Sequence, residues 1–79
     1  MRTPSGLSAA FGRLIKKQRT RQGLSQEALA EKAGVHHTYV SMVERGARKP
    51  TIEAGEALAR ALGSKLSVLI EEAEREARR

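Results

Sequence analysis

Two adjacent histidines raise the possibility of metal chemistry in this chain. His36 and His37 stand side by side, and Glu44 follows them by less than ten residues. Imidazole nitrogens and carboxylate oxygens are both zinc ligands. Neighbouring residues on a helix, however, point about 100° apart, so they cannot easily share one ion, whereas helical ligand pairs favour a four-residue spacing. The chain also lacks cysteine and aspartate. The sequence therefore predicts no metal site, and it leaves the histidines as solvated side chains or as parts of a binding surface.

Catalytic groups are equally scarce. Without cysteine or aspartate, the chain offers no thiol nucleophile and no mixed carboxylate pair. Four glutamates near the end, in "EEAEREARR", form a solvated tail rather than an acid–base pair in an apolar pocket. No glycine-rich phosphate loop is present. We expect no enzyme activity and no cofactor.

The distribution of charge points to a polyanionic partner. The formal net charge is +6, and residues 1–50 hold ten Lys and Arg against three Glu, whereas residues 51–79 hold five against six. Such a basic half favours contact with nucleic acid or an anionic lipid surface, although it could also serve only as solubilising charge. No apolar run approaches the roughly 18 residues of a membrane span, and the N-terminus lacks the apolar region of a signal peptide. We therefore expect a cytoplasmic protein that does not cross a membrane, in keeping with the absence of cysteine.

The helical elements follow from the apolar periodicity, which lies near 3.6 residues throughout. The sequence predicts an all-α single domain over residues 1–79, with its core within about residues 8–70. The predicted helices cover residues 8–22, 26–32, 36–45, 52–62 and 67–77, and Pro4 and Pro50 lie outside them. Ser25, Thr51 and Ser67 are the predicted N-caps.

The apolar stripes of these helices predict the buried side chains. The side chains expected to face inward are Leu7, Phe11, Leu14, Ile15, Gln18, Leu24, Leu29, Val35, Val40, Val43, Ile52, Leu58, Ala59, Leu62, Leu66, Leu69, Ile70, Ala73 and Ala77.

Residues 26–45, "QEALAEKAGVHHTYVSMVER", have the residue types of two helices joined by a tight turn. Such a pair crosses at about 90–120°, so the first helix needs a small residue at the crossing, and Ala30 supplies it. Gly34 can adopt the positive φ of the turn without a Cβ penalty. The second helix can pack against the core through Val35, Val40 and Val43. Together these positions indicate a helix-turn-helix unit.

Residues 11–70 resemble the helix-turn-helix family of phage repressors, Cro proteins and Xre-type regulators. The stretches "GLSQEALAEKAGV", "TYVSMVERG" and "KPTI" are especially similar to the controller proteins of restriction-modification systems. The resemblance implies a compact five-helix domain and a homodimer that binds a palindromic operator. It also implies a transcription regulator, which could control a restriction-modification operon.

In this architecture the second helix of the motif lies in the major groove, with its N-terminal residues at base edges. With Val40 and Val43 facing inward, the opposite side of the helix carries the predicted base-reading residues: His37, Thr38, Ser41 and Met42. Donors around it are predicted to contact phosphates, namely Gln26, Tyr39, Arg45, Arg48 and Lys49, with Arg21 a weaker candidate. Gln26 could instead contact a base.

The resemblance further implies a structural ion pair between Arg19 and Glu44, which would join the first and third helices. Helix 67–77 is predicted to serve partly in dimerisation, through Leu66, Leu69, Ile70 and Ala73. We expect no small-molecule effector.

Two residues depart from the family pattern. His36 stands where a better helix cap is common, so the start of that helix is less well specified. Gly55 lies inside a predicted helix, and we expect a second helix to approach it, across the dimer for example.

Two alternatives remain open at this stage. One is a prophage repressor or an antitoxin of the same fold. The other is a helix-turn-helix module that contacts protein or RNA rather than duplex DNA.

Overall fold

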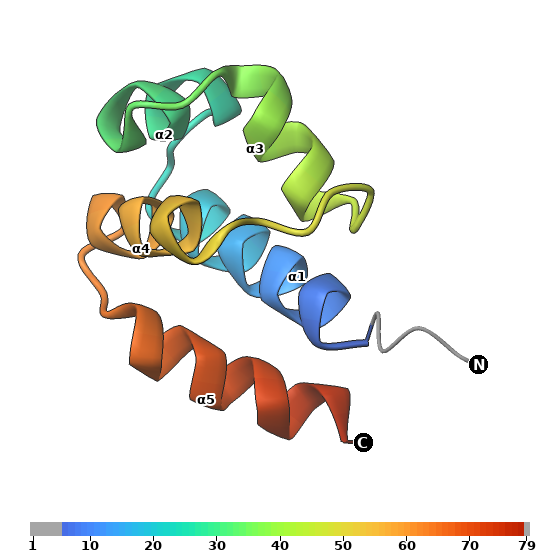
Figure 1. Ribbon diagram of the computed structural model, residues 1–79. Helices are drawn as coiled ribbons and strands as arrows, with labels where there is room; N and C mark the ends of the chain where they lie inside the picture. Colours follow the sequence, from blue (N-terminus) through green and yellow to red (C-terminus); the bar gives the residue numbers. More distant parts are fainter. Residues whose placement is uncertain (1–5, 79) are drawn as a thin grey trace.

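The computed structural model describes residues 6–78, which form five helices without strands among them (Figure 1). The helices are α1 (Gly6–Arg21), α2 (Gln26–Ala33), α3 (His37–Glu44), α4 (Ile52–Ala61) and α5 (Leu66–Ala77). Their bounds agree with the predicted segments to within one or two residues. Pro4, which is predicted to lie outside the helices, is not among the described residues. Within residues 6–78, no helix combines the length and the apolar character that a membrane crossing requires.

The first helix, α1, lies at the centre of the arrangement. Figure 1 shows α2 and α3 on one side of α1 and α5 on the other, with α4 between α2 and α5, the two helices against which it packs. The N-terminal end of α1 lies near the C-terminal end of α5, where Arg13 and Glu76 form an ion pair of 2.7 Å. Every helix contributes to one apolar core, which consists of Ala10, Phe11, Leu14, Ile15, Leu29, Ala30, Val40, Val43, Leu58, Ala59, Leu62, Leu69 and Ala73.

Three predicted inward positions are exposed. Ile52 is 77 % exposed, and Leu7 and Ala77 are also exposed. Ile52 and Leu7 lie in the first turns of α4 and α1, and Ala77 is the last residue of α5. At these helix ends the apolar stripe extends beyond the other described helices, and residues 6–78 leave it exposed.

Two of the three predicted N-caps are confirmed. The hydroxyls of Ser25 and Thr51 accept hydrogen bonds from the amides of Ala28 and Ala54, respectively, at 2.9 and 3.0 Å. The prediction for Ser67 is wrong, because α5 begins one residue earlier and Lys65 takes the capping position without a side-chain bond.

The helix that approaches Gly55 belongs to the same chain. A Cβ built at Gly55 would lie 3.3 Å from Leu66 Cδ1 and 3.6 Å from Phe11 Cζ. The small residue at this position therefore admits α5 and α1 to the buried side of α4, and the contact does not require a dimer.

Candidate nucleic-acid interface

The turn between α2 and α3 holds the two helices in a fixed relation. Gly34 has φ 74° and ψ 30°, and its amide donates to the carbonyls of Ala30 and Glu31. A side chain at this position would be strained, because L-residues rarely adopt a positive φ. Leu29 and Ala30 of α2 are buried beneath the crossing, as the sequence predicts.

Helix α3 separates a buried side from an open one. Val40, Val43 and Glu44 are buried, whereas His37 and Thr38 are exposed and Ser41 and Met42 are half-buried. The predicted base-reading residues, which we call the recognition face, therefore keep solvent access. His37 and Thr38, at the N-terminal end of α3, are its most exposed members.

His36 caps α3 despite its unusual residue type. Its Nδ1 accepts a hydrogen bond of 3.1 Å from the Thr38 amide, which satisfies one of the free N–H groups at the helix start. The ring also stacks on that of His37, with their centroids 4.5 Å apart. His36 thereby fixes the backbone from which the recognition face projects.

A basic margin borders the C-terminal side of α3. Arg45, Arg48 and Lys49, which form this margin, are all exposed on the segment that leads to α4. The Arg48 guanidinium carbon lies 5.6 Å from the centre of the Tyr39 ring, within cation–π range. The Tyr39 hydroxyl oxygen accepts a bond of 3.3 Å from the Thr51 amide. Tyr39 thus ties the start of α4 to α3 and retains its O–H proton to donate elsewhere.

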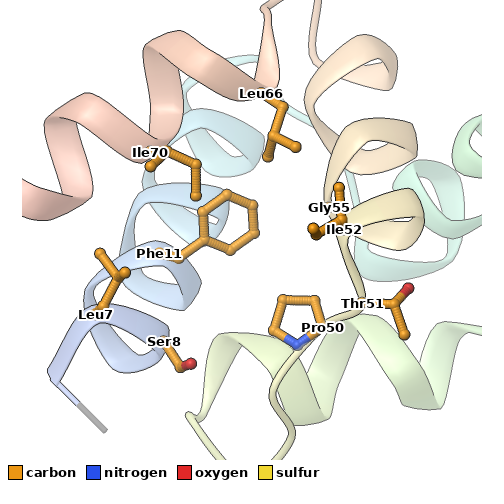
Figure 2. A pocket seen from close by; sticks show the side chains of 9 residues that line it. All are labelled: Leu7, Ser8, Phe11, Pro50, Thr51, Ile52, Gly55, Leu66 and Ile70. Carbon is orange, nitrogen blue, oxygen red and sulfur yellow. The ribbon is translucent and has the colours of Figure 1, made fainter. Parts of the chain in front are cut away.

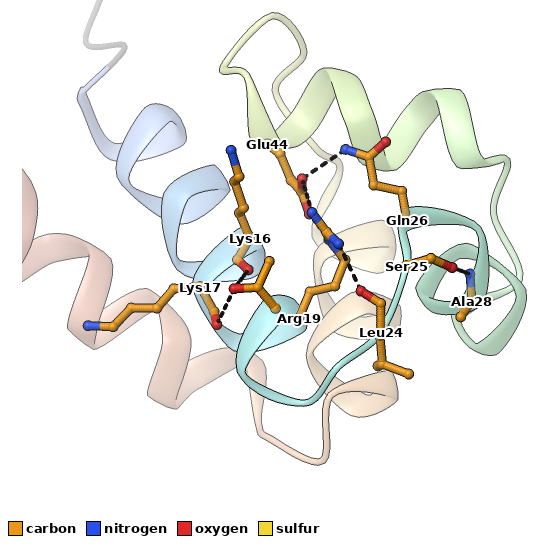
Figure 3. A network of polar contacts seen from close by, with 9 residues as sticks. Lys16, Lys17, Arg19, Leu24, Ser25, Gln26, Ala28 and Glu44 are labelled. Carbon is orange, nitrogen blue, oxygen red and sulfur yellow. Dashed lines mark hydrogen bonds and ion pairs between the residues drawn. The ribbon is translucent and has the colours of Figure 1, made fainter.

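A buried polar network joins α1, α2 and α3 (Figure 3). Arg19 donates from Nε to Glu44 Oε2 at 2.6 Å and from Nη2 to Oε1 at 3.1 Å. The Arg19 side chain is 11 % exposed and that of Glu44 is 2 % exposed. Arg19 Nη1 also donates to the Leu24 carbonyl at 2.8 Å, and Gln26 Nε2 donates to Glu44 Oε1 at 2.9 Å. The predicted ion pair is therefore confirmed, and Gln26 is an additional member that the sequence did not predict.

Both oxygens of Glu44 are engaged in this network, where they accept bonds from Arg19 and Gln26. Between residues 6 and 78, no group of three His or Glu side chains gathers as a metal site would require.

An apolar hollow of about 180 Å³ opens between α1, α4 and α5 (Figure 2). Its walls are Leu7, Ser8, Phe11, Pro50, Thr51, Ile52, Gly55, Leu66 and Ile70. None of these residues is charged, although Lys, Arg and Glu make up 30 % of the chain. The hollow and the exposed Ile52 at its edge form an apolar surface that residues 6–78 leave uncovered.

The predicted dimer-interface residues divide into two pairs. Leu69 and Ala73 are buried in the core of the single chain, where α1 covers that side of α5. Leu66 and Ile70 are half-buried and line the apolar hollow.

Comparison with known proteins defines the class of protein. Residues 15–69 match the family model described as helix-turn-helix, and the chain belongs to this family. It is 41 % identical over 58 residues to the uncharacterized HTH-type transcriptional regulator Rv0474 of Mycobacterium tuberculosis. That match covers 73 % of this chain but only 41 % of the relative, so the matched segment is less than half of this regulator's length.

The more specific likeness is to restriction-modification controller proteins. Control protein C.BamHI of Bacillus amyloliquefaciens is 37 % identical over 54 residues, which cover 67 % of each protein. The solved structure of the controller protein C.Esp1396I, a tetramer in complex with its natural 35 base-pair operator, superposes with a TM-score of 0.81. Its sequence is 33 % identical, and the match covers 92 % of this chain and 96 % of that one. The resemblance noted in the sequence is thereby confirmed.

Proposed function

We propose that this protein is a transcription regulator that binds duplex DNA with α3 in the major groove. The observation that carries the proposal is the division of α3 into a buried side and an exposed recognition face bordered by the basic margin. The recognition face supplies hydrogen-bonding and apolar groups for base edges, and the margin supplies cations for phosphates. The controller protein in complex with its operator supports the same use of the fold.

The recognition residues have complementary chemistry. The His37 imidazole can bond to guanine N7 or O6, and the Thr38 hydroxyl can bond to an edge while its methyl contacts thymine. Ser41 and Met42 lie one turn further along, where a hydroxyl and a thioether side chain extend the same face. Because Ser41 and Met42 are partly buried, their side chains have less freedom to move. They therefore form the edge of the contact, and His37 and Thr38 form its centre.

The phosphate contacts fall on both sides of the recognition face. Arg45, Arg48 and Lys49 lie after α3, and Gln26 lies at the start of α2. Gln26 uses one amide N–H for Glu44, so its second N–H is the donor for a phosphate beside the α2 N-terminus. Tyr39 contributes its hydroxyl proton. Most of the affinity then comes from ionic contacts that are independent of sequence.

We propose a homodimer whose interface includes the apolar hollow and Ile52. A small domain gains buried surface from a second copy, and an uncharged surface can associate without desolvating ions. A twofold axis would place two copies of α3 about 34 Å apart, which matches one turn of duplex and a palindromic operator. The revised interface residues are Leu7, Ile52, Leu66 and Ile70.

The relatives suggest the biological setting. C.BamHI is a control protein and C.Esp1396I is a restriction-modification controller protein, so we propose a cytoplasmic regulator of a restriction-modification operon. No catalytic role, cofactor or small-molecule effector enters this proposal. Its concentration and its dimerisation would set its occupancy of the operator.

Selection of bound sequences from a random duplex pool tests the proposal. We expect enrichment of a palindrome whose half-sites lie one helical turn apart, with binding that weakens as salt increases. Recovery of no preferred duplex, together with binding to single-stranded RNA or to protein alone, would assign the recognition face to another partner.

A further inference from the structure

Among the described glycines, the one with the least room for a side chain is Gly12, in the middle of α1. A Cβ built on this residue would lie 2.1 Å from the Val43 carbonyl oxygen, 3.1 Å from the Val43 carbonyl carbon and 3.3 Å from the Glu44 Cα. All three atoms belong to the backbone of the last turn of α3. A flexible side chain could move aside, but this backbone cannot do so without moving the helix.

The conformation of Gly12 does not itself require glycine. The glycines with positive φ are Gly23, Gly34, Gly46 and Gly63, and Gly12 has an ordinary helical backbone. Glycine is also among the least favourable residues in a helix interior. The close approach of α3 is therefore the physical reason for glycine at this position.

Gly12 is one of several contacts that hold the C-terminal end of α3 against a single face of α1. Ala9 lies beneath Gly46, where a built Cβ would be 3.6 Å from the Ala9 Cβ. Arg19, seven residues beyond Gly12 and on the same face of α1, binds Glu44. Figure 1 shows the other end of α3, where His37 begins the helix, standing away from α1.

We infer that Gly12 is a positioning residue: the absence of a side chain there sets the distance between α1 and the end of α3, and thereby the place at which His37 and Thr38 meet DNA. This inference rests on the proposed function. A methyl group at residue 12 has to displace the Val43 carbonyl by about 1 Å, because Cβ contacts under 3.0 Å essentially do not occur. The eight residues of α3 span about 12 Å, so a shift or tilt at one end carries the other end with it.

Base contacts and phosphate contacts respond differently to such a shift. Groups that recognise a ligand through directed hydrogen bonds need placement within about 0.5 Å. The basic margin consists of long side chains on an exposed segment, which can follow a phosphate over a larger distance. Displacement of α3 should therefore reduce sequence discrimination while general affinity for duplex DNA remains.

The test compares Gly12→Ala with Gly6→Ala in the same helix, where a Cβ would lie 3.9 Å from the Ala77 Cβ and has room. Dissociation constants are measured for the selected operator and for a scrambled duplex. We expect Gly12→Ala to reduce the ratio of specific to non-specific affinity about tenfold or more, with the non-specific affinity retained and Gly6→Ala unchanged. A merely structural role would lower the folded fraction, which weakens both affinities equally and leaves the ratio unchanged. An unchanged ratio would overturn the inference.

A second variant decides the matter if Gly12→Ala does not fold. Arg19→Lys keeps the charge but loses the forked bond to Glu44, which is the other attachment of the same end of α3. It should show the same selective loss of discrimination, and an unchanged ratio would again count against positioning by α1.

The natural protein provides a separate test of the proposed function. If the natural protein does not distinguish the operator from the scrambled duplex, the proposed function fails. The positioning of α3 can still be measured without DNA, through the amide chemical shifts of His37 and Thr38. These shifts should change in Gly12→Ala and stay the same in Gly6→Ala, and unchanged shifts in both variants would overturn the inference.

Discussion

Arg19 and Glu44 form a two-point ion pair between α1 and α3, with a side-chain exposure of 11 % and 2 %. The third bond to the Glu44 carboxylate comes from Gln26 at the start of α2. Three helices, α1, α2 and α3, thus meet at one buried carboxylate. The pair lies on the inner side of α3 and serves to hold this helix, while the recognition face remains open on the other side.

Removal of one partner should be costly. Glu44→Ala leaves the Arg19 charge largely buried without its counter-ion, so we expect the free energy of unfolding to fall by about 3–5 kcal/mol in urea denaturation. Glu76→Ala is the matched control, because its partner Arg13 is 59 % exposed and an exposed pair contributes at most about 1 kcal/mol. Replacement of both members of the buried pair by Met and Leu should recover much of the loss. Equal losses of unfolding free energy in Glu44→Ala and Glu76→Ala would show that the buried pair stabilises the fold no more than the exposed pair.

Loss of a base-reading group should affect only the specific complex. His37→Ala or Thr38→Ala should weaken binding to the selected operator by about 1–3 kcal/mol and change binding to scrambled duplex little, because both side chains are exposed and hold no core contact. Gel-shift titrations with the two duplexes measure the difference. Equal losses on both duplexes would remove the base-reading role.

Loss of a phosphate contact should have the opposite signature. Arg48→Ala should weaken binding to all duplexes and reduce the slope of log K against log salt by about 1. The salt dependence of binding, measured by fluorescence anisotropy, tests this expectation. Glu53→Gln, a nearby exposed change outside the basic margin, provides a control for general effects of charge. A slope that stays constant in Arg48→Ala would place this side chain away from phosphate.

The apolar hollow predicts the effect of Ile52 on assembly. Ile52→Gln should weaken the dimer without unfolding the chain, because the side chain is 77 % exposed and outside the core. Sedimentation measures the dimer fraction and circular dichroism the helix content. The neighbouring Glu53→Gln does not touch the hollow and should leave the dimer intact. A dimer that survives Ile52→Gln would have to use a different surface.

His36 should behave as a helix cap rather than as a DNA contact. His36→Ala removes the acceptor for the Thr38 amide, so we expect a loss of about 1 kcal/mol in the free energy of unfolding. His36→Asn should restore this stability, since asparagine is a strong cap. Thermal denaturation of both variants is sufficient. Equal melting temperatures for the natural protein and His36→Ala would mean that the bond contributes nothing.

The periodicity of the sequence was sufficient to predict the five helices and the two sides of α3. Val40 and Val43 are buried and His37 is exposed because a helix presents its faces at a fixed period, whatever the details of packing. The turn at Gly34 was predictable for a similar reason, since few residues other than glycine tolerate its backbone angles.

Predictions that depend on where a helix ends were less successful. Ile52 continues the apolar stripe of α4, but its exposure depends on how far α1 and α5 extend beside it. The apolar stripe of α5 predicts a dimer contact for Leu69, although the position of α1 buries this side chain. A periodic pattern identifies a face of a helix and does not identify the neighbour that covers it.

Contacts between residues far apart in the sequence were the hardest to predict from the sequence. The bond from Gln26 to Glu44 depends on the side-chain rotamers that a crossing of α2 and α3 permits, and the close approach at Gly12 depends on the distance between two helices. A glycine inside a helical stripe is the available sign in the sequence; it predicts the close approach at Gly55, and no such prediction is made at Gly12.

The most direct test of the account measures binding of the natural protein to its selected operator and to a scrambled duplex over about 50–200 mM salt. We predict binding to both duplexes that weakens steeply with salt, and a preference for the operator of about a thousandfold or more that His37→Ala reduces. Equal affinity for the two duplexes at every salt concentration, or no binding to either, would contradict the claim that α3 reads duplex DNA.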